Sequence, residues 1–202
     1  MFNKIKNWLF HEDLKKQNLA AFIMLVGSGL GLLASFVLSI EALELAKNSH
    51  AVLSCDFSSA LSCSAVANHW SAAILGFSNS FIGVMTLPVM VTIAVALLAG
   101  AKFPKWFMQA AQAGAIIGMI FAIWMFYMSY VEIGVLCPWC LTLDLGMLMI
   151  MFGLTRYNVL QKNISCRCAQ KIVGGGYDVL VVVSLVVAVI VAIIAKFGSQ
   201  LF

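Results

Sequence analysis

Charged residues are scarce in this sequence. Only 10% of its 202 residues are Asp, Glu, Lys or Arg, whereas 63% are hydrophobic. Soluble domains contain about a quarter charged residues, so this scarcity excludes a water-soluble globular protein. The net charge is only +4 and the basic residues are dispersed, which excludes a basic surface for nucleic acid. The composition therefore predicts an integral membrane protein.

Two familiar patterns are also absent, namely internal repeats and a dinucleotide-binding fingerprint. The segment 27–31 is rich in glycine, but its spacing is wrong for that fingerprint and it lies within an apolar run. Small residues inside a membrane helix let a second helix approach closely. We therefore expect 27–31 to be a helix-packing surface.

Five apolar segments are long enough to cross a membrane. At 1.5 Å per residue, a helix of about 20 residues crosses a hydrocarbon core of about 30 Å. The sequence predicts one all-α membrane domain over residues 1–202, with an outer loop at 46–76. The expected spans are 18–45, 77–101, 106–131, 137–155 and 178–196.

The basic residues predict the orientation of the spans. With a cytoplasmic N-terminus, ten of the twelve fall on the cytoplasmic side: Lys4, Lys6, Lys15, Lys16, Lys102, Lys105, Arg156, Lys162, Arg167 and Lys171. Only Lys47 and Lys196 fall outside. The positive-inside rule then predicts a multi-pass protein of the cytoplasmic (inner) membrane with its C-terminus outside. The first span exceeds a signal-peptide core of about 7–15 residues, and we expect it to be retained.

This topology divides the six cysteines into two groups. Cys55, Cys63, Cys137 and Cys140 lie at the outer membrane face, where an oxidising compartment favours disulfides. Cys166 and Cys168 lie in a cytoplasmic loop. They are either half of a metal site or, as we favour, reduced thiols without a special function.

The motif Cys137-Pro138-Trp139-Cys140 stands at the start of the fourth span. Proline is favoured at the first helical position, so Cys137 is expected near the helix N-cap. The positive end of a helix stabilises a thiolate, and thiol–disulfide exchange requires a thiolate. A structural disulfide and half of a zinc site remain alternatives, because Cys55 and Cys63 could complete four zinc ligands.

Cys55 and Cys63 are separated by seven residues on the outer loop. Zinc motifs usually have about two to four residues between paired ligands, so this spacing favours electron relay over metal binding. A static loop disulfide remains the alternative. Cys55 precedes the charged Asp56, so we expect Cys55 to be the more solvent-facing cysteine of the two.

Taken together, the motifs resemble the bacterial branch of the vitamin K epoxide reductase family. The resemblance covers about residues 19–155 and rests on Cys55-Asp56, Ser62-Cys63-Ser64, Gly76-Phe77-Ser78-Asn79-Ser80-Phe81-Ile82-Gly83 and Cys137-Pro138-Trp139-Cys140. The related DsbB-type oxidases place their C-x-x-C motif in the first outer loop. The order is reversed here, which favours the reductase family.

The resemblance implies a four-helix transmembrane bundle that holds a quinone near its outer face, followed by a fifth transmembrane helix. It implies a quinone-dependent thiol–disulfide oxidoreductase that generates disulfides outside the cytoplasm. Cys55 and Cys63 are then the shuttle pair, and Cys137 and Cys140 are the active-site pair. Cys137 exchanges with Cys63, and Cys140 faces the quinone, which is ubiquinone or menaquinone.

Two polar residues are candidate quinone ligands. Asn79 matches a family asparagine that hydrogen-bonds a quinone oxygen, but its residue type and position also favour a helix N-cap. Asp144 lies inside the fourth span, where a carboxylate costs about 2.5–3.5 kcal/mol, so it should face the bundle interior. It lies one helical turn beyond Cys140. It either donates a proton or hydrogen bond to quinone, or pairs with a polar group on another helix.

Many bacterial relatives carry a fused thioredoxin-like domain after the fifth helix. Only residues 196–202 follow that helix here. We therefore expect a separate thioredoxin-fold partner, similar to DsbA, in the periplasm or another extracytoplasmic space. Membrane lipid is the other expected partner.

Two other functions are compatible with the four outer cysteines. A membrane metal-binding protein would use their thiols as ligands. A structural protein would hold them as two static disulfides. The redox interpretation requires no metal, and it predicts that quinone changes the state of the thiols.

Overall fold

The computed structural model describes residues 12–49, 51–164 and 166–201. The secondary structure elements in these ranges are helices. Lys4 and Lys6, two basic residues used to predict the topology, lie outside the described residues. Five described helices are long and apolar enough to cross a membrane. They are α2 (Glu12–Lys47), α4 (Ser80–Leu98), α5 (Lys105–Tyr127), α6 (Pro138–Leu160) and α8 (Tyr177–Leu201). The predicted all-α membrane fold is confirmed.

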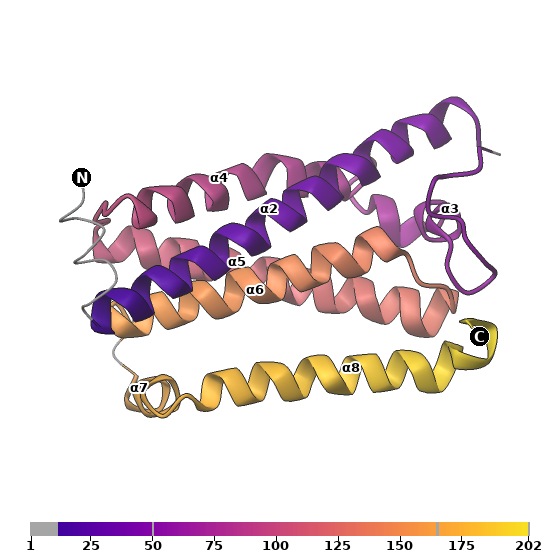
Figure 1. Cartoon of the computed structure of the whole chain (residues 1–202). Helices are drawn as coiled ribbons and strands as arrows, with labels where there is room; N and C mark the ends of the chain where they lie inside the picture. Colours follow the sequence, from indigo (N-terminus) through magenta and orange to yellow (C-terminus); the bar gives the residue numbers. More distant parts are fainter. Residues whose placement is uncertain (1–11, 50, 165, 202) are drawn as a thin grey trace.

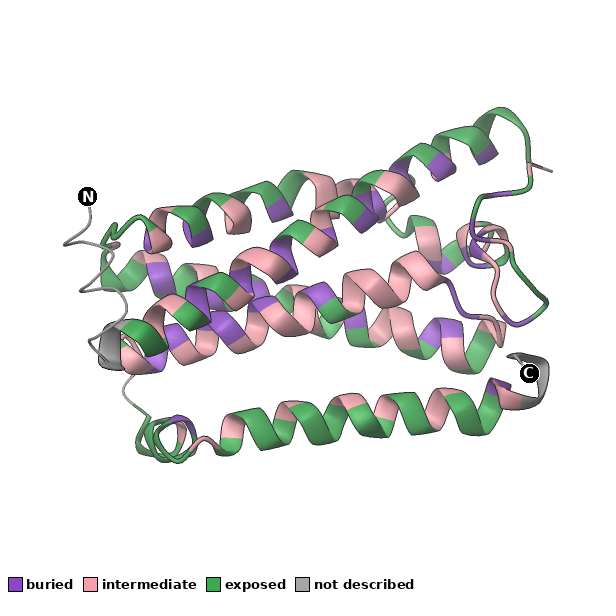
Figure 2. Cartoon of the chain, viewed as in Figure 1, coloured by how far each residue is buried: buried purple, intermediate pink, exposed green. Residues whose placement is uncertain are grey.

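Four of these helices form a bundle, and the fifth lies outside it. Helix α2 packs against both α4 and α6, and α5 packs against α6. Figure 1 shows α8 running along the side of the other four helices. In Figure 2 the buried residues lie on the inner faces of the bundle, whereas α8 is exposed along most of its length. This agrees with the predicted four-helix bundle and additional fifth helix.

Helices α2 and α6 pack closely against each other. A Cβ atom added at Gly146 would lie 2.6 Å from the carbonyl oxygen of Gly27, and one added at Gly153 would lie 2.5 Å from that of Ala20. Real side chains do not approach a backbone so closely. The glycines therefore let the two helices pack backbone to backbone. The predicted packing role of 27–31 is confirmed at Gly27.

Helix α8 is fixed to the rest of the protein at its two ends. Near its start, Asp178 forms a salt bridge of 3.0 Å with Arg156 of α6. Near its end, Phe197 is fully buried and packs against Leu136, and the Tyr130 hydroxyl donates a hydrogen bond of 3.1 Å to the Ala192 carbonyl. A short helix, α7 (Arg167–Gly174), precedes it.

The cysteines of the predicted outer face come together at one end of the bundle, which we call the cysteine end (Cys55, Cys63 and Cys137). A π-helical segment, η2 (Met128–Ile133), extends α5 toward this end and stops at Gly134, which adopts φ 70°. Leu136 then pairs with the loop that carries Cys55. Its N–H donates to the Ala60 carbonyl over 2.9 Å, and its carbonyl accepts from Ser62 N–H over 3.0 Å. This pairing holds the loop beside Cys137.

Candidate active site

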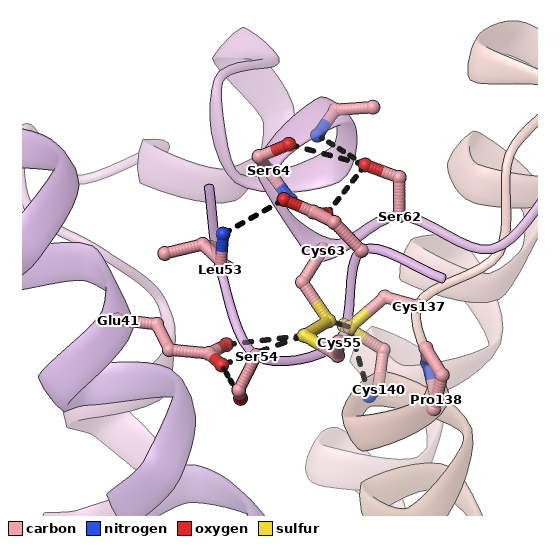
Figure 3. Close-up of a disulfide and its surroundings, with 12 residues drawn as sticks. Glu41, Leu53, Ser54, Cys55, Ser62, Cys63, Ser64, Cys137, Pro138 and Cys140 are labelled. Atoms are coloured by element: carbon pink, nitrogen blue, oxygen red, sulfur yellow. Dashed lines mark hydrogen bonds between the residues drawn. A yellow bond between two sulfur atoms is a disulfide. The ribbon is translucent and has the colours of Figure 1, made fainter. Parts of the chain in front are cut away.

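Three sulfur atoms from two loops meet at the cysteine end. Cys55 and Cys63 are joined by a disulfide with a Cα–Cα distance of 5.6 Å, and Cys137 and Cys140 are free thiols. Cys63 begins the short helix α3 (Cys63–Ala67), and its Sγ lies 3.0 Å from the Sγ of Cys137. Figure 3 shows the sulfurs of the disulfide and of Cys137 gathered at the start of α6.

Cys137 is the N-cap residue of α6, as its sequence context predicted. Pro138 occupies the first turn, and the Cys137 Sγ accepts a hydrogen bond of 3.4 Å from the N–H of Cys140. A hydrogen bond from the Cys140 thiol and the N–H groups of Cys140 and Trp139 lower the pKa of Cys137, although burial opposes this. The helix start therefore stabilises a thiolate in contact with Cys63.

This arrangement suits thiol–disulfide exchange. In such an exchange a thiolate attacks one sulfur of a disulfide and the other sulfur leaves. The Cys137 sulfur is in contact with Cys63, so Cys63 is the sulfur through which the two cysteine pairs can exchange. The sulfurs of Cys55, Cys63 and Cys137 all lie within 4.8 Å of one another, so they also form a possible group of metal ligands.

Asp56 organises the loop of residues 51–63, which we call the disulfide loop. Its Oδ1 accepts hydrogen bonds from Ser64 N–H (3.0 Å) and the Ser62 hydroxyl (2.7 Å), and its Oδ2 accepts from Leu53 N–H (2.9 Å). Burial acts to raise the pKa of Asp56, but these hydrogen bonds outweigh it and lower the pKa to about 2. The carboxylate thus ties the two ends of the loop together.

Both cysteines of the disulfide are buried, so the predicted difference in exposure between Cys55 and Cys63 is negligible. Cys55 is 2% exposed and Cys63 is 1% exposed. The expectation assumed that the charge of Asp56 would draw its neighbour toward water. The Asp56 carboxylate instead accepts hydrogen bonds from its own loop, which folds the backbone over the disulfide.

Glu41 is a site residue that the sequence analysis did not identify. It lies near the end of α2 and is only 5% exposed. Its two carboxylate oxygens lie 3.4 Å and 3.5 Å from the Sγ of Cys55, and the Ser54 hydroxyl donates a hydrogen bond of 2.7 Å to it. The argument that singled out Asp144, a carboxylate in an apolar helix, could have found Glu41 as well.

An apolar cavity of about 530 Å³ extends from the cysteines into the bundle between α2, α4, α5 and α6. Cys140, Asn79 and Asp144 line it together. Its walls also include Val89 of α4 and Ile117 of α5, whose side chains are exposed on the outer surface of the bundle. The cavity therefore reaches the apolar surface between α4 and α5.

Asn79 stands at the N-cap position of α4, but its side chain does not cap the helix. The amide nitrogen donates a hydrogen bond of 2.7 Å to the carbonyl of Ser71, and the amide oxygen accepts one of 3.3 Å from Ile74 N–H. The nitrogen also lies 3.6 Å from the sulfur of Met125 on the opposite wall of the cavity. The amide thus joins the preceding 3₁₀ helix, η1 (Trp70–Ala73), to the cavity.

Asp144 is half-buried on α6, one turn beyond Cys140. Among the residues that the structure describes, no hydrogen-bonding or ionic partner contacts its carboxylate. The structure thus gives no support to pairing with a polar group on another described helix, whereas its place in the cavity wall leaves a ligand as a possible partner.

The other two cysteines lie away from this site. Cys166 is the N-cap residue of α7 and Cys168 lies in its first turn, and both side chains are exposed. The N–H groups of Ala169 and Cys168 lower the pKa of Cys166.

A comparison with known proteins gives the family of this chain. The model of the Vitamin K epoxide reductase family matches residues 22–155, which is more than half of the chain. A comparison with curated proteins gives no match. In general, enzymes of this family are oxidoreductases that use quinones and work with thioredoxin-like partners. The chain, with five long apolar helices among its described residues, is a multi-pass membrane protein that belongs to the vitamin K epoxide reductase family.

Proposed function

We propose that this protein oxidises thiols outside the cytoplasm and passes their electrons to a membrane quinone, thereby generating disulfides. The observation that carries this proposal is the 3.0 Å contact between the sulfurs of Cys63 and Cys137, with Cys140 facing an apolar cavity. One cysteine pair thus contacts the other, and the second pair borders a space for an apolar acceptor.

The proposed electron path begins with a separate thioredoxin-fold protein that carries two thiols. These reduce the Cys55–Cys63 disulfide, and the partner leaves with a disulfide. Cys63 then attacks Cys137 in a Cys137–Cys140 disulfide, and Cys55 displaces Cys137 from Cys63. This restores Cys55–Cys63 and leaves thiols at Cys137 and Cys140, which is the combination of bonded and free cysteines in the structure.

The cavity residues fit a quinone, either ubiquinone or menaquinone. When bound, a quinone supplies an acceptor for two electrons and two protons. The apolar walls suit its ring, and the opening between α4 and α5 suits a ligand that arrives from lipid. The second N–H of Asn79 faces the sulfur of Met125, a weak acceptor that a quinone oxygen would replace. Asp144 is the candidate to hold a proton near Cys140.

The proposed orientation places the cysteine end outside the cytoplasm, in the cytoplasmic (inner) membrane. Its support is the ten-to-two division of basic residues along the sequence. This end then faces a compartment in which partner disulfides persist.

The test is anaerobic mixing of the reduced protein with a soluble short-chain quinone while quinol formation is followed spectroscopically. The proposal expects one quinol for each pair of thiols lost, and formation of both disulfides. Thiols that remain reduced in the presence of quinone would refute the proposal and favour static disulfides.

A metal-binding function is the second candidate, because the sulfurs of Cys55, Cys63 and Cys137 lie within 4.8 Å of one another. Two of these sulfurs are bonded to each other, so metal binding would require their reduction. Stoichiometric zinc in the purified reduced protein, with no oxidation by quinone, would support this candidate instead.

A further inference from the structure

We propose that Glu41 is the catalytic base of Cys55: its carboxylate takes the proton from the Cys55 thiol when Cys55 attacks Cys63. This inference rests on the proposed function, because it concerns one step of the exchange between the two cysteine pairs. It assigns a proton acceptor to a thiol that has no helix N-terminus to stabilise its thiolate.

The contact between Glu41 and Cys55 is direct. Both carboxylate oxygens lie within 3.5 Å of the Cys55 sulfur, and Figure 3 shows the carboxylate pointing at that sulfur from α2. In the disulfide form this sulfur carries no proton. In the thiol form the same geometry is an S–H···O hydrogen bond, along which the proton can move to the carboxylate.

The carboxylate of Glu41 is held in place and is shielded from water. The side chain is 5% exposed, and the hydroxyl of Ser54, the residue before Cys55, donates a hydrogen bond of 2.7 Å to one of its oxygens. A base that is already aligned with the thiol needs no rearrangement before proton transfer.

Asp56 is the other carboxylate close to Cys55 in sequence, but the structure gives it a different task. Both of its oxygens accept hydrogen bonds within the disulfide loop, and its pKa of about 2 makes it a poor proton acceptor. Glu41 is thus the carboxylate that contacts a reacting sulfur.

The proposed step balances in bonds, electrons and protons. It starts from a Cys63–Cys137 disulfide and a Cys55 thiol. The Cys55–Cys63 bond forms, the Cys63–Cys137 bond breaks, and its electron pair leaves with the Cys137 sulfur. The proton of Cys55 passes to Glu41, and the new Cys137 thiolate is stabilised at the start of α6. The structure has the geometry of the products, with the Cys137 sulfur still 3.0 Å from Cys63.

Four charged or titratable groups surround Glu41. They are Glu44, Asp56, Cys137 and Cys140, which interact electrostatically with the Glu41 carboxylate. Without Glu41, Cys55 must ionise by itself, and a free cysteine does so near pH 8.5. The loss of the base should therefore matter most at neutral pH and least at alkaline pH.

The experiment compares Glu41→Gln with Glu44→Gln in the full-length protein. Glu44 is an exposed carboxylate one turn further along α2, so its variant is a matched control. A small dithiol serves as electron donor and a soluble quinone as acceptor, and quinol formation is measured from pH 6.5 to 9.5, a range of about three pH units around the thiol pKa. Acid quenching and non-reducing peptide mapping report the disulfides present during turnover.

For Glu41→Gln we expect a loss of about 10²-fold at neutral pH, the typical contribution of a general base, with recovery at alkaline pH. The Cys63–Cys137 disulfide should accumulate during turnover. Glu41→Asp should retain part of the rate, and Glu44→Gln should match the wild type. Recovery at alkaline pH also requires a folded variant, so it separates loss of the base from misfolding.

A Glu41→Gln protein with the wild-type rate at neutral pH would overturn the inference. So would a rate loss that does not recover at alkaline pH while Cys63–Cys137 fails to accumulate. Failure of the proposed function is distinguishable, since the wild-type protein itself would then form no quinol.

Discussion

Cys137 and Cys166 occupy the same local position, because each is the N-cap residue of a helix. A hydrogen bond from the Cys140 thiol, together with backbone N–H groups, lowers the pKa of Cys137. The N–H groups of Ala169 and Cys168 lower the pKa of Cys166. Each cysteine also has a second cysteine within its first helical turn. At the level of the motif, both pairs look equally suited to redox chemistry.

Their surroundings differ. Cys137 is 1% exposed, lies 3.0 Å from the Cys63 sulfur and borders an apolar cavity, whereas Cys166 is exposed on α7. A helix start is enough to favour a thiolate. Relay of electrons also requires a neighbouring disulfide on one side and a place for an acceptor on the other. The tertiary neighbours of Cys137, and not its lowered pKa, therefore distinguish the candidate active site.

The largest expected effect is the difference in activity between variants of the Cys137–Cys140 pair and variants of the Cys166–Cys168 pair. Cys137→Ser or Cys140→Ser should lower the rate of quinol formation by at least about 10³-fold, because loss of a nucleophile typically costs several orders of magnitude. The double variant Cys166→Ser/Cys168→Ser should stay within about twofold of the wild type, as exposed substitutions usually do. Equal losses in both sets would show that Cys166 and Cys168 also take part in the reaction.

The second expected effect is a difference in how readily a reagent reaches the thiols of Cys166 and Cys137. In detergent, a thiol reagent should alkylate Cys166 at least about 10²-fold faster than Cys137, because a buried thiol reacts only after local opening. In intact cells, a membrane-impermeant reagent should leave Cys166 unlabelled, and permeabilisation should expose it. Labelling is measured by mass spectrometry of the two peptides. Strong labelling of Cys166 in intact cells would reverse the proposed orientation.

Much of the fold was predictable because it depends on local sequence properties. Long apolar runs predicted five spans, and the described part of the chain contains five helices of sufficient length. Proline after cysteine predicted Cys137 as an N-cap, and glycine at position 27 predicted close helix packing. Each of these inferences needs only a residue, its immediate neighbours and the solvent around it.

The predictions that failed or were missing depend on contacts between distant segments. The exposure of Cys55 could not be deduced from Asp56, because hydrogen bonds with Leu53 and Ser64 turn that carboxylate into its own loop. The apolar surroundings of Glu41 in sequence could have marked it as a candidate, but its contact with a cysteine 14 positions later depends on how the disulfide loop folds. Asn79 has the residue type of a cap, but its amide bonds to the preceding 3₁₀ helix.

A smaller effect is expected when the disulfide loop is loosened, which should make Cys137 behave more like Cys166. Asp56→Asn should raise the alkylation rate of Cys137 by about five- to tenfold, since weakening charge-assisted hydrogen bonds costs roughly 1 kcal/mol. Asp178→Asn, at the other end of the molecule, is the control and should leave this rate unchanged.

The same carboxylate predicts a dependence on pH. Folding lowers the pKa of Asp56 from its ordinary value of 3.8 to about 2, so its stabilisation is present above about pH 4 and is lost as the pH falls toward 2. The rate at which Cys137 forms a mixed disulfide with an acid-active disulfide reagent should therefore rise over this interval in the wild type but stay level in Asp56→Asn. If the labelling rate of Cys137 rises equally in both proteins, the acid sensitivity of the loop comes from another group.

The smallest expected effect tests the cavity, the second feature that Cys137 has and Cys166 lacks. Asn79→Ala removes the amide that faces Met125, and we expect the KM for quinone to rise about threefold, the equivalent of one hydrogen bond of about 0.7 kcal/mol. The maximal rate should change little, because the cysteines keep their positions. Thermal unfolding of the same samples tests whether Asn79 has only a structural role. A loss of roughly 1 kcal/mol in stability with an unchanged KM would reduce Asn79 to a structural residue at the start of α4.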